Sequence, residues 1–192
     1  MRMARRHCVV VMVVVALQAV AQTSEFGKFV GSVVIELQKD GRGALTMEPF
    51  TYVDPTGALW EVPKGAFTDG ASIPQVFWIL YPPFVGKYRD SAVMHDYYCN
   101  VQSRGWRDTH KAFYYAMRAN GVDEIVAKTM YSAVFHFGPR WGIGSKKRGP
   151  LSEFPPEVQR EKLEELGSWI AKSNPSIQDI EDVLSREPRR IQ

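Results

Sequence analysis

The 192-residue sequence predicts an α+β protein, in which a small antiparallel β-meander precedes a helical bundle and an additional C-terminal helical tail. Three observations predict this fold class. Residues 26–67 are rich in β-branched and aromatic residues and are interrupted by turn signals. Residues 68–138 place apolar residues at helical spacing, and residues 157–172 form a charged amphipathic segment. With 45% hydrophobic and 23% charged residues, the composition is that of a globular chain.

Residues 1–21 have the regions of a secretory signal peptide: three arginines, an apolar stretch over residues 8–17, and small residues before an expected cleavage at Gln22. A retained N-terminal anchor is the alternative, although the apolar stretch is short for a bilayer. The three arginines account for the whole excess of 24 Lys and Arg over 21 Asp and Glu. The remaining neutral chain argues against a nucleic-acid partner bound through phosphates. We expect a periplasmic or secreted protein with no membrane span after signal cleavage.

The β-region is expected to contain three strands that follow one another as a meander. Residues 29–37 are the first strand, and an Asp-Gly signal within residues 39–43 predicts the first turn. Residues 44–53 are the second strand, residues 54–57 are a Pro- and Gly-containing turn, and residues 58–62 are the third strand. Residues 26–145 are expected to form a single α+β domain.

Three helices are expected in the middle of the chain, over residues 88–100, 107–120 and 123–137. The tail, residues 146–192, begins with a basic loop and continues as amphipathic helices. Leu163, Leu166 and Ile170 form the apolar stripe of the helix at 157–172. Asn174 before Pro175 predicts the start of a last short helix that ends near Ser185.

Three short motifs follow one another along the chain and contain the polar residues that could form a functional site. They are Thr68-Asp69-Gly70-Ala71-Ser72-Ile73-Pro74, then His95-Asp96, then Arg104 with Asp108. The ordered set, with a lead-in at Tyr52, Asp54, Gly57 and Val62-Pro63, resembles the family called domain of unknown function 1353, which is common in phages and bacteria. The resemblance covers about residues 45–138. It implies a family and no activity, because no reaction is established for that family.

His95 is the candidate general base, since a helical histidine that meets a carboxylate has its tautomer and orientation set by that acid. Asp108 is the better partner, because Asp96 follows His95 directly and points to another side of the helix. Asp69 and Ser72 lie in a Gly-containing bend, a kind of loop that presents groups to a cleft. We therefore expect Asp69, His95 and Asp108 to converge, with Ser72 and Asp96 as further members of the catalytic site.

Three chemistries fit these residues. A His–Asp dyad can activate water for hydrolysis. A divalent metal ion can be held by Asp69, His95 and Asp108, with water completing its shell. Cys99, four residues after His95, can act as a nucleophile, although a place near a helix C-terminus works against a low thiol pKa. Cys99 is also the cysteine that remains after signal cleavage, so no intrachain disulfide is expected. His110 and His136 lack a partner at ligand spacing and are expected at core or solvated positions.

The same polar residues also fit a purely structural role as helix caps, a core histidine and ion pairs. Two functions therefore remain open. One is an exported hydrolase that acts on a cell-envelope component, an inference from export and phage association. The alternative is a non-catalytic interaction module whose polar cluster is structural and whose C-terminal helices bind another protein.

Overall fold

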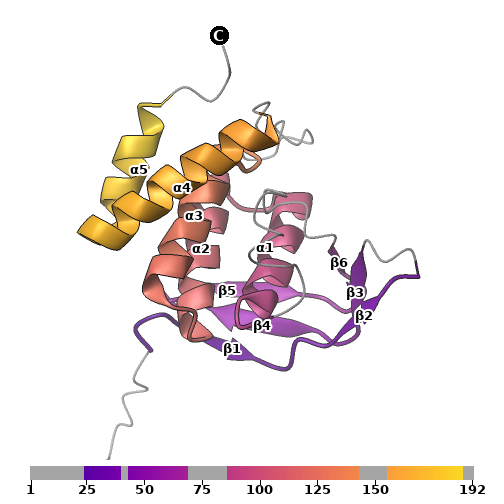
Figure 1. The fold of residues 1–192 in the computed structure, drawn as a ribbon. Helices are drawn as coiled ribbons and strands as arrows, with labels where there is room; N and C mark the ends of the chain where they lie inside the picture. Colours follow the sequence, from indigo (N-terminus) through magenta and orange to yellow (C-terminus); the bar gives the residue numbers. More distant parts are fainter. Residues whose placement is uncertain (1–23, 40–42, 69–85, 143–154, 188–192) are drawn as a thin grey trace, which may run out of the picture.

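The computed structural model describes residues 24–39, 43–68, 86–142 and 155–187. It confirms the α+β class, with two small antiparallel sheets followed by helices (Figure 1). The described strands are β1 (Lys28–Val30), β2 (Ile35–Leu37), β3 (Ala44–Thr46), β4 (Phe50–Val53), β5 (Leu59–Val62) and β6 (Phe67–Thr68). The described helices are α1 (Arg89–Val101), α2 (Trp106–Ala119), α3 (Glu124–Phe137), α4 (Pro156–Ser173) and α5 (Ile177–Ser185).

The strands form two three-stranded sheets, β1-β4-β5 and β2-β3-β6, in place of one continuous meander. The strand expected over residues 29–37 divides between the two sheets after Gly31, which has a φ of +87°. A side chain is strained in that left-handed conformation, and glycine adopts it freely. The strand expected over residues 44–53 divides in the same way into β3 and β4. The first two predicted strands therefore contribute to both sheets, whereas the third forms β5 in one sheet only. Alternating hydrophobicity alone does not indicate this division.

The turn at residues 54–57 forms as predicted and joins β4 to β5. The amide of Gly57 donates to the Asp54 carbonyl at 2.9 Å, and the amide of Asp54 donates to the Ala58 carbonyl at 3.0 Å. The resulting register pairs Tyr52 with Trp60, and both side chains are buried. This turn lies at one edge of the candidate site described below.

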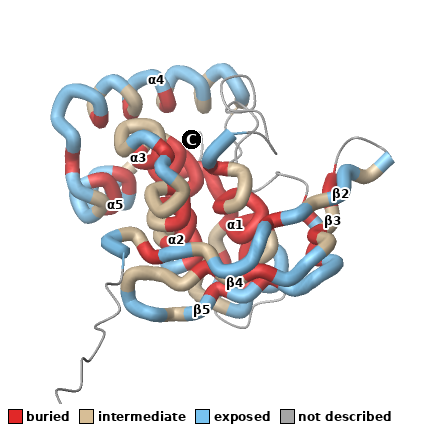
Figure 2. The backbone as a smooth tube through the Cα atoms, turned by 90° about the horizontal axis from the view of Figure 1, so that it is seen from below, coloured by how far each residue is buried: buried red, intermediate tan, exposed pale blue. Residues whose placement is uncertain are grey.

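The buried side chains form two neighbouring hydrophobic clusters that meet at α2. In the first, Tyr52, Trp60 and Val62 pack with Met94 of α1 and Ala116 of α2. The second joins α2 and α3 to the C-terminal helices. Figure 2 shows the buried positions concentrated along α1, α2 and α3, while α4 is buried only at intervals.

The C-terminal helices share the second cluster with α3. The predicted stripe of Leu163, Leu166 and Ile170 is buried there, as are Ile180 and Leu184 of α5. These apolar faces are therefore occupied within the chain. The basic loop at 146–148 lies outside the described residues.

The start predicted for the last helix was wrong by two residues. Asn174 is the C-cap of α4, with a φ of 41°, and Ser176 is the N-cap of α5. The hydroxyl of Ser176 accepts from the amide of Asp179, and the carboxylate of Asp179 accepts from the amide of Ser176. This reciprocal capping box satisfies two backbone donors, so it determines where the helix begins.

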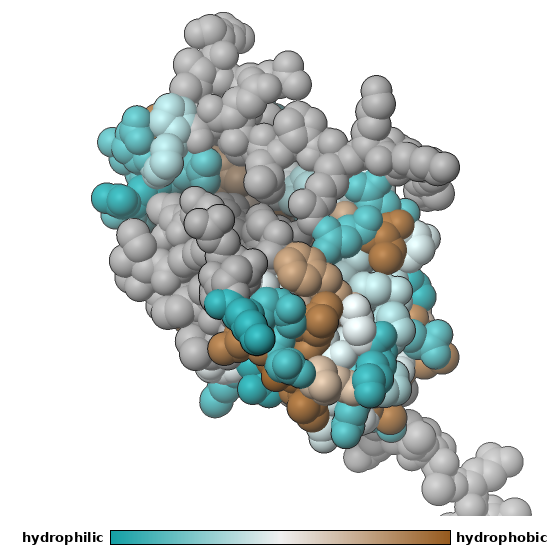
Figure 3. All heavy atoms as spheres, turned by 90° about the vertical axis from the view of Figure 1, so that its right-hand side faces the viewer, coloured by the Kyte–Doolittle hydropathy of each residue, from teal (hydrophilic) through white to brown (hydrophobic). Residues whose placement is uncertain are grey.

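The face at the right of Figure 1 carries apolar side chains interspersed among hydrophilic ones (Figure 3). Among the described residues, the exposed apolar side chains of the β2-β3-β6 sheet include those of Leu37 and Phe67. Scattered apolar exposure of this kind is common on globular proteins. Within the described ranges, no helix is both long and apolar enough to cross a membrane.

Candidate functional site

Helices α1 and α2 bring three buried side chains into contact. His95 and Cys99 lie one turn apart on α1, His110 comes from α2, and all three have 0% exposure. The Nε2 atom of His95 lies 2.8 Å from Nδ1 of His110. The Sγ atom of Cys99 lies 3.6 Å from the same His95 Nε2. We call these three residues the His–Cys–His cluster.

The protonation of the two imidazoles follows from their partners. The Nε2 atom of His110 lies 3.2 Å from the carbonyl oxygen of Pro139, which can only accept, so this nitrogen donates. In a neutral His110 ring, Nδ1 is then the acceptor. With His110 in this neutral form, His95 Nε2 carries the proton that it donates to His110. A directed chain of hydrogen bonds runs from α1 through α2 to the segment after α3.

Burial keeps His95 neutral. Desolvation lowers the pKa of His95 from 6.5 to about 3, because the imidazolium form loses its hydration in the interior. The ring stacks on Phe113 with a centroid separation of 4.7 Å, which adds to the apolar surroundings. A neutral histidine with these contacts can hold a hydrogen bond or a metal ion, but it has no exposed surface at which to meet bulk water.

Asp96 is also buried, with 1% exposure, and points to a different partner. Its Oδ2 atom accepts a hydrogen bond of 2.7 Å from the hydroxyl of Thr68 at the end of β6. This bond ties α1 to the second sheet. Asp69 and Ser72, which follow Thr68 in the sequence motif, lie outside the described residues.

The structure places Asp108 apart from His95. Asp108 is exposed in the first turn of α2, where its negative charge is favoured by the helix dipole. The hydrogen-bond partners of His95 in the described part of the chain are His110 and Cys99. The expected pairing of His95 with Asp108 is therefore not formed, and His110 occupies that place.

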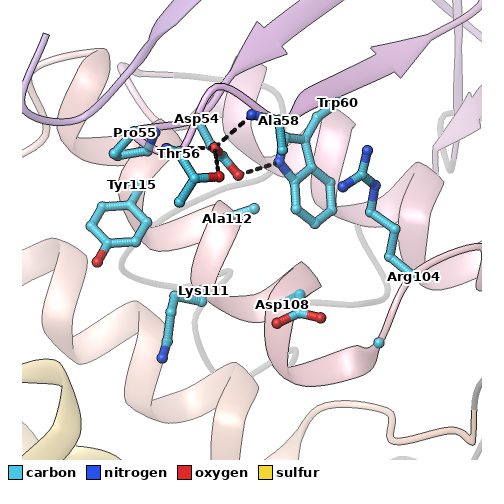
Figure 4. A pocket seen from close by; sticks show the side chains of 11 residues that line it. Asp54, Pro55, Thr56, Ala58, Trp60, Arg104, Asp108, Lys111, Ala112 and Tyr115 are labelled. Carbon is cyan, nitrogen blue, oxygen red and sulfur yellow. Dashed lines mark hydrogen bonds between the residues drawn. The ribbon is translucent and has the colours of Figure 1, made fainter. Parts of the chain in front are cut away.

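Asp108 instead lines an open cleft of about 340 Å³ between the β4–β5 turn and α2. We call it the Asp108 cleft. Figure 4 shows the turn residues on one side and Asp108 with Lys111 on the other, with Arg104 and Tyr115 at the ends. The cleft is lined by Asp54, Pro55, Thr56, Ala58, Trp60, Arg104, Gly105, Asp108, Lys111, Ala112 and Tyr115. It contains two acidic and two basic side chains.

Asp54 fixes the wall of the cleft that the turn provides. Its Oδ1 atom accepts from the amide of Thr56 at 2.8 Å, from the hydroxyl of Thr56 at 2.6 Å and from the amide of Ala58 at 3.0 Å. Its Oδ2 atom accepts from the indole Nε1 of Trp60 at 2.9 Å. Desolvation raises the pKa of Asp54, but these hydrogen bonds outweigh it and hold the pKa below the usual value.

The remaining charged residues of the cleft differ in how firmly they are held. The Arg104 guanidinium lies 4.3 Å from the ring centroid of Trp60 and donates to the carbonyl of Leu59 at 2.6 Å. Lys111 forms an ion pair of 2.9 Å with Glu181 of α5. Asp108 makes no hydrogen bond or ion pair with any of the residues that the structure describes. Its carboxylate is therefore available to a ligand.

His110 is the residue that sequence reasoning missed. Its Nδ1 atom, His95 Nε2 and Cys99 Sγ all lie within 4.8 Å of one another, so the three side chains can converge on one metal ion. The signal was present in the sequence as two histidines on consecutive helices, one of them four residues before a cysteine. The metal ligand set expected from the sequence, Asp69, His95 and Asp108, shares only His95 with this cluster.

The family model described as a protein of unknown function (DUF1353) matches residues 45–134. The uncharacterized protein y4jT of Sinorhizobium fredii is 52% identical over 98 residues, which cover 50% of this chain and 29% of that protein. The uncharacterized protein y4iH of the same organism is 42% identical over 120 residues, which cover 59% of this chain and 48% of that protein.

The chain thus spans less than half the length of these two curated relatives. No solved structure matches it. The matched region begins in the β-region and ends in α3, so it contains the His–Cys–His cluster and the residues lining the Asp108 cleft. Residues 45–134 therefore resemble the domain of unknown function 1353 family, as the ordered motifs around His95 and Asp108 had indicated.

Proposed function

We propose that this protein is an exported, non-catalytic binding module that takes a polar component of the cell envelope in the Asp108 cleft. The observation that carries the proposal is the contrast between Asp108 and His95. Asp108 is an exposed carboxylate on the wall of an open cleft and has no partner among the described residues. His95, the candidate base, has 0% exposure and internal hydrogen bonds. Export remains the prediction made from residues 1–21.

The lining of the cleft indicates the chemistry of its ligand. Asp108 favours a cationic group, which would gain a charge-assisted hydrogen bond. Arg104 lies beside it in the cleft wall and favours an anionic group on the same ligand. Trp60 and Tyr115 add aromatic surface, which is typical of sites that hold small organic ligands. Envelope fragments that carry both ammonium and carboxylate groups, such as peptide-bearing glycans, fit this description.

Calorimetry tests the proposal with soluble peptidoglycan fragments released by muramidase digestion as the probe. We expect binding by the wild type and a loss of at least about tenfold in affinity in Asp108→Asn, because a charge-assisted hydrogen bond contributes about 1.5–3 kcal/mol. Asp182→Asn is the matched control, since Asp182 is exposed on α5 and is not part of the cleft lining. Equal affinities in the two variants, or no binding by the wild type, would contradict the proposal.

The hydrolase hypothesis is the second candidate and needs its own measurement. It requires His95 to deliver or remove a proton at a water molecule, and the full burial of the ring weighs against that role. Prolonged incubation of the same fragments with the protein, followed by mass analysis, should reveal no new chain ends. Cleavage that disappears in a folded His95→Gln variant would replace the binding module with an enzyme.

A further inference from the structure

We infer that the His–Cys–His cluster is a binding site for a soft divalent transition-metal ion of the zinc class, held by Sγ of Cys99, Nε2 of His95 and Nδ1 of His110. The inference rests on the buried interface between α1 and α2. It does not depend on the ligand proposed for the Asp108 cleft.

The spacing of the three atoms is close to that of a tetrahedral zinc site. Zinc bonds of about 2.0–2.1 Å to nitrogen and about 2.3 Å to sulfur place two nitrogens about 3.3 Å apart and a nitrogen and a sulfur about 3.6 Å apart. The Cys99 Sγ to His95 Nε2 separation is already 3.6 Å. The two histidine nitrogens, now 2.8 Å apart, would have to separate by about half an ångström.

The surroundings of the cluster match those of a metal site. The Nε2 atom of His110 donates to the carbonyl of Pro139, and this outer hydrogen bond aims Nδ1 at the centre of the cluster. Metal-bound histidines usually have such a partner on their second nitrogen. Phe113 stacks on His95, and the ring of Trp106 lies 5.6 Å from that of His110. The aromatic shell limits the access of solvent to the ion.

The ligand types select the metal. A thiolate and two imidazoles favour zinc, cobalt or copper over magnesium and calcium, which prefer oxygen ligands. His95 and Cys99 are four residues apart on one helix and therefore project to the same side. Three protein ligands leave the fourth tetrahedral position for water or another donor.

Metal binding displaces the thiol proton of Cys99 and shifts the ring proton of His95. Before binding, Cys99 carries its thiol proton and His95 carries a proton on Nε2. The metal ion takes the lone pairs of the thiolate, His95 Nε2 and His110 Nδ1, so the His95 proton moves to Nδ1 of the same ring. The thiol proton leaves to solvent. One proton is therefore released for each ion bound, with no change in oxidation state.

The experiment uses the full chain carrying Cys8→Ser, so that Cys99 is the only thiol. After chelation and dialysis, the protein is titrated with Zn²⁺ by calorimetry in two buffers of different ionisation enthalpy, and separately with Co²⁺ by absorption. We expect one ion per chain, the release of one proton with Zn²⁺, and a thiolate-to-cobalt charge-transfer band with Co²⁺. Binding of less than a tenth of an equivalent, or bound cobalt without that band, would overturn the inference.

Two variants identify the ligands. Cys99→Ser should lose the charge-transfer band, and His110→Gln should weaken zinc binding by at least about tenfold, since even outer-shell losses cost 10–100-fold. His136→Gln is the matched control, because His136 is also buried but lies on α3 outside the cluster. Circular dichroism shows whether each variant is folded. If a variant does not fold, the cobalt spectrum of the Cys8→Ser chain alone tests the inference. Zinc affinity lowered equally by His110→Gln and His136→Gln would also overturn the inference.

Discussion

The hydrogen bond between His95 and His110 provides a quantitative test of how the two helices are held together. Replacing His110 with leucine removes the acceptor of the His95 N–H, which has no exposure in the interior. A buried donor left without a partner costs about 1–3 kcal/mol. The same change removes the donor to the Pro139 carbonyl, which adds about 0.5–1.5 kcal/mol. We expect His110→Leu to lower the free energy of unfolding by about 2–4 kcal/mol.

A double-mutant cycle separates this hydrogen bond from packing changes. The double variant, His95→Leu with His110→Leu, has no buried ring nitrogen that lacks a partner at either position. Leucine is also close to histidine in volume. Replacement of both partners by apolar groups is far less costly than the loss of one. The double variant should therefore lose about 1–2 kcal/mol less than the two single variants added together. Urea denaturation at pH 7 with a chelator present measures the four unfolding free energies. Single-variant losses that add within about 0.3 kcal/mol would refute the reasoning.

Two further predictions concern the other polar contacts of the sheets. Thr68→Val removes the hydrogen bond to buried Asp96 and should cost about 1.5–3 kcal/mol of unfolding free energy, whereas Thr68→Ser, which keeps the hydroxyl, should cost less. Equal losses would show that the hydroxyl is dispensable. Because the folded pKa of Asp54 is depressed, its contribution is fully present above the usual value of 3.8 and is lost as pH falls through the lower folded value. As the pH falls through that range, the free energy of unfolding should decrease less steeply in Asp54→Asn than in the wild type. An equal pH dependence in the two proteins would contradict the role of Asp54.

The helices could be predicted from the sequence because their ends and their buried faces are encoded locally. The expected limits of the helices in residues 88–137 agree with α1, α2 and α3 to within one residue. The start of α5 was misplaced because Asn174 and Ser176 are both acceptable N-caps by type. The reciprocal bonds between Ser176 and Asp179 decide between them.

The division of the strands into two sheets could not be predicted from the local sequence. The pattern of residues 29–37 is uniformly typical of a β-strand, yet residues 31–34, which begin with the left-handed Gly31, separate β1 from β2. Beyond this break, β1 pairs with β4, which lies more than fifteen residues away in the sequence, and β2 pairs with β3. Strand pairing of this kind depends on tertiary contacts that periodicity does not report.

The candidate site was partly predictable. The proximity of His95 and Cys99 follows from helical spacing alone. The partner from α2 was predicted as Asp108 but is His110. The two residues lie about 160° apart around the helix axis, so only one of them can face α1. The rotation of α2 is determined by its packing against both hydrophobic clusters. A short sequence motif contains no information about that rotation.

The most direct test of the account is nuclear magnetic resonance of the His95 ring N–H in the chelated protein. In the structure, His95 belongs to a sealed contact between α1 and α2, and not to a solvent-facing catalytic site. A ring N–H that donates to a buried acceptor exchanges slowly with water, because opening requires local unfolding. At pH 7 we predict a protected Nε2–H signal from His95 that disappears in His110→Leu. A His95 ring N–H that exchanges at the rate of a free imidazole would contradict the account.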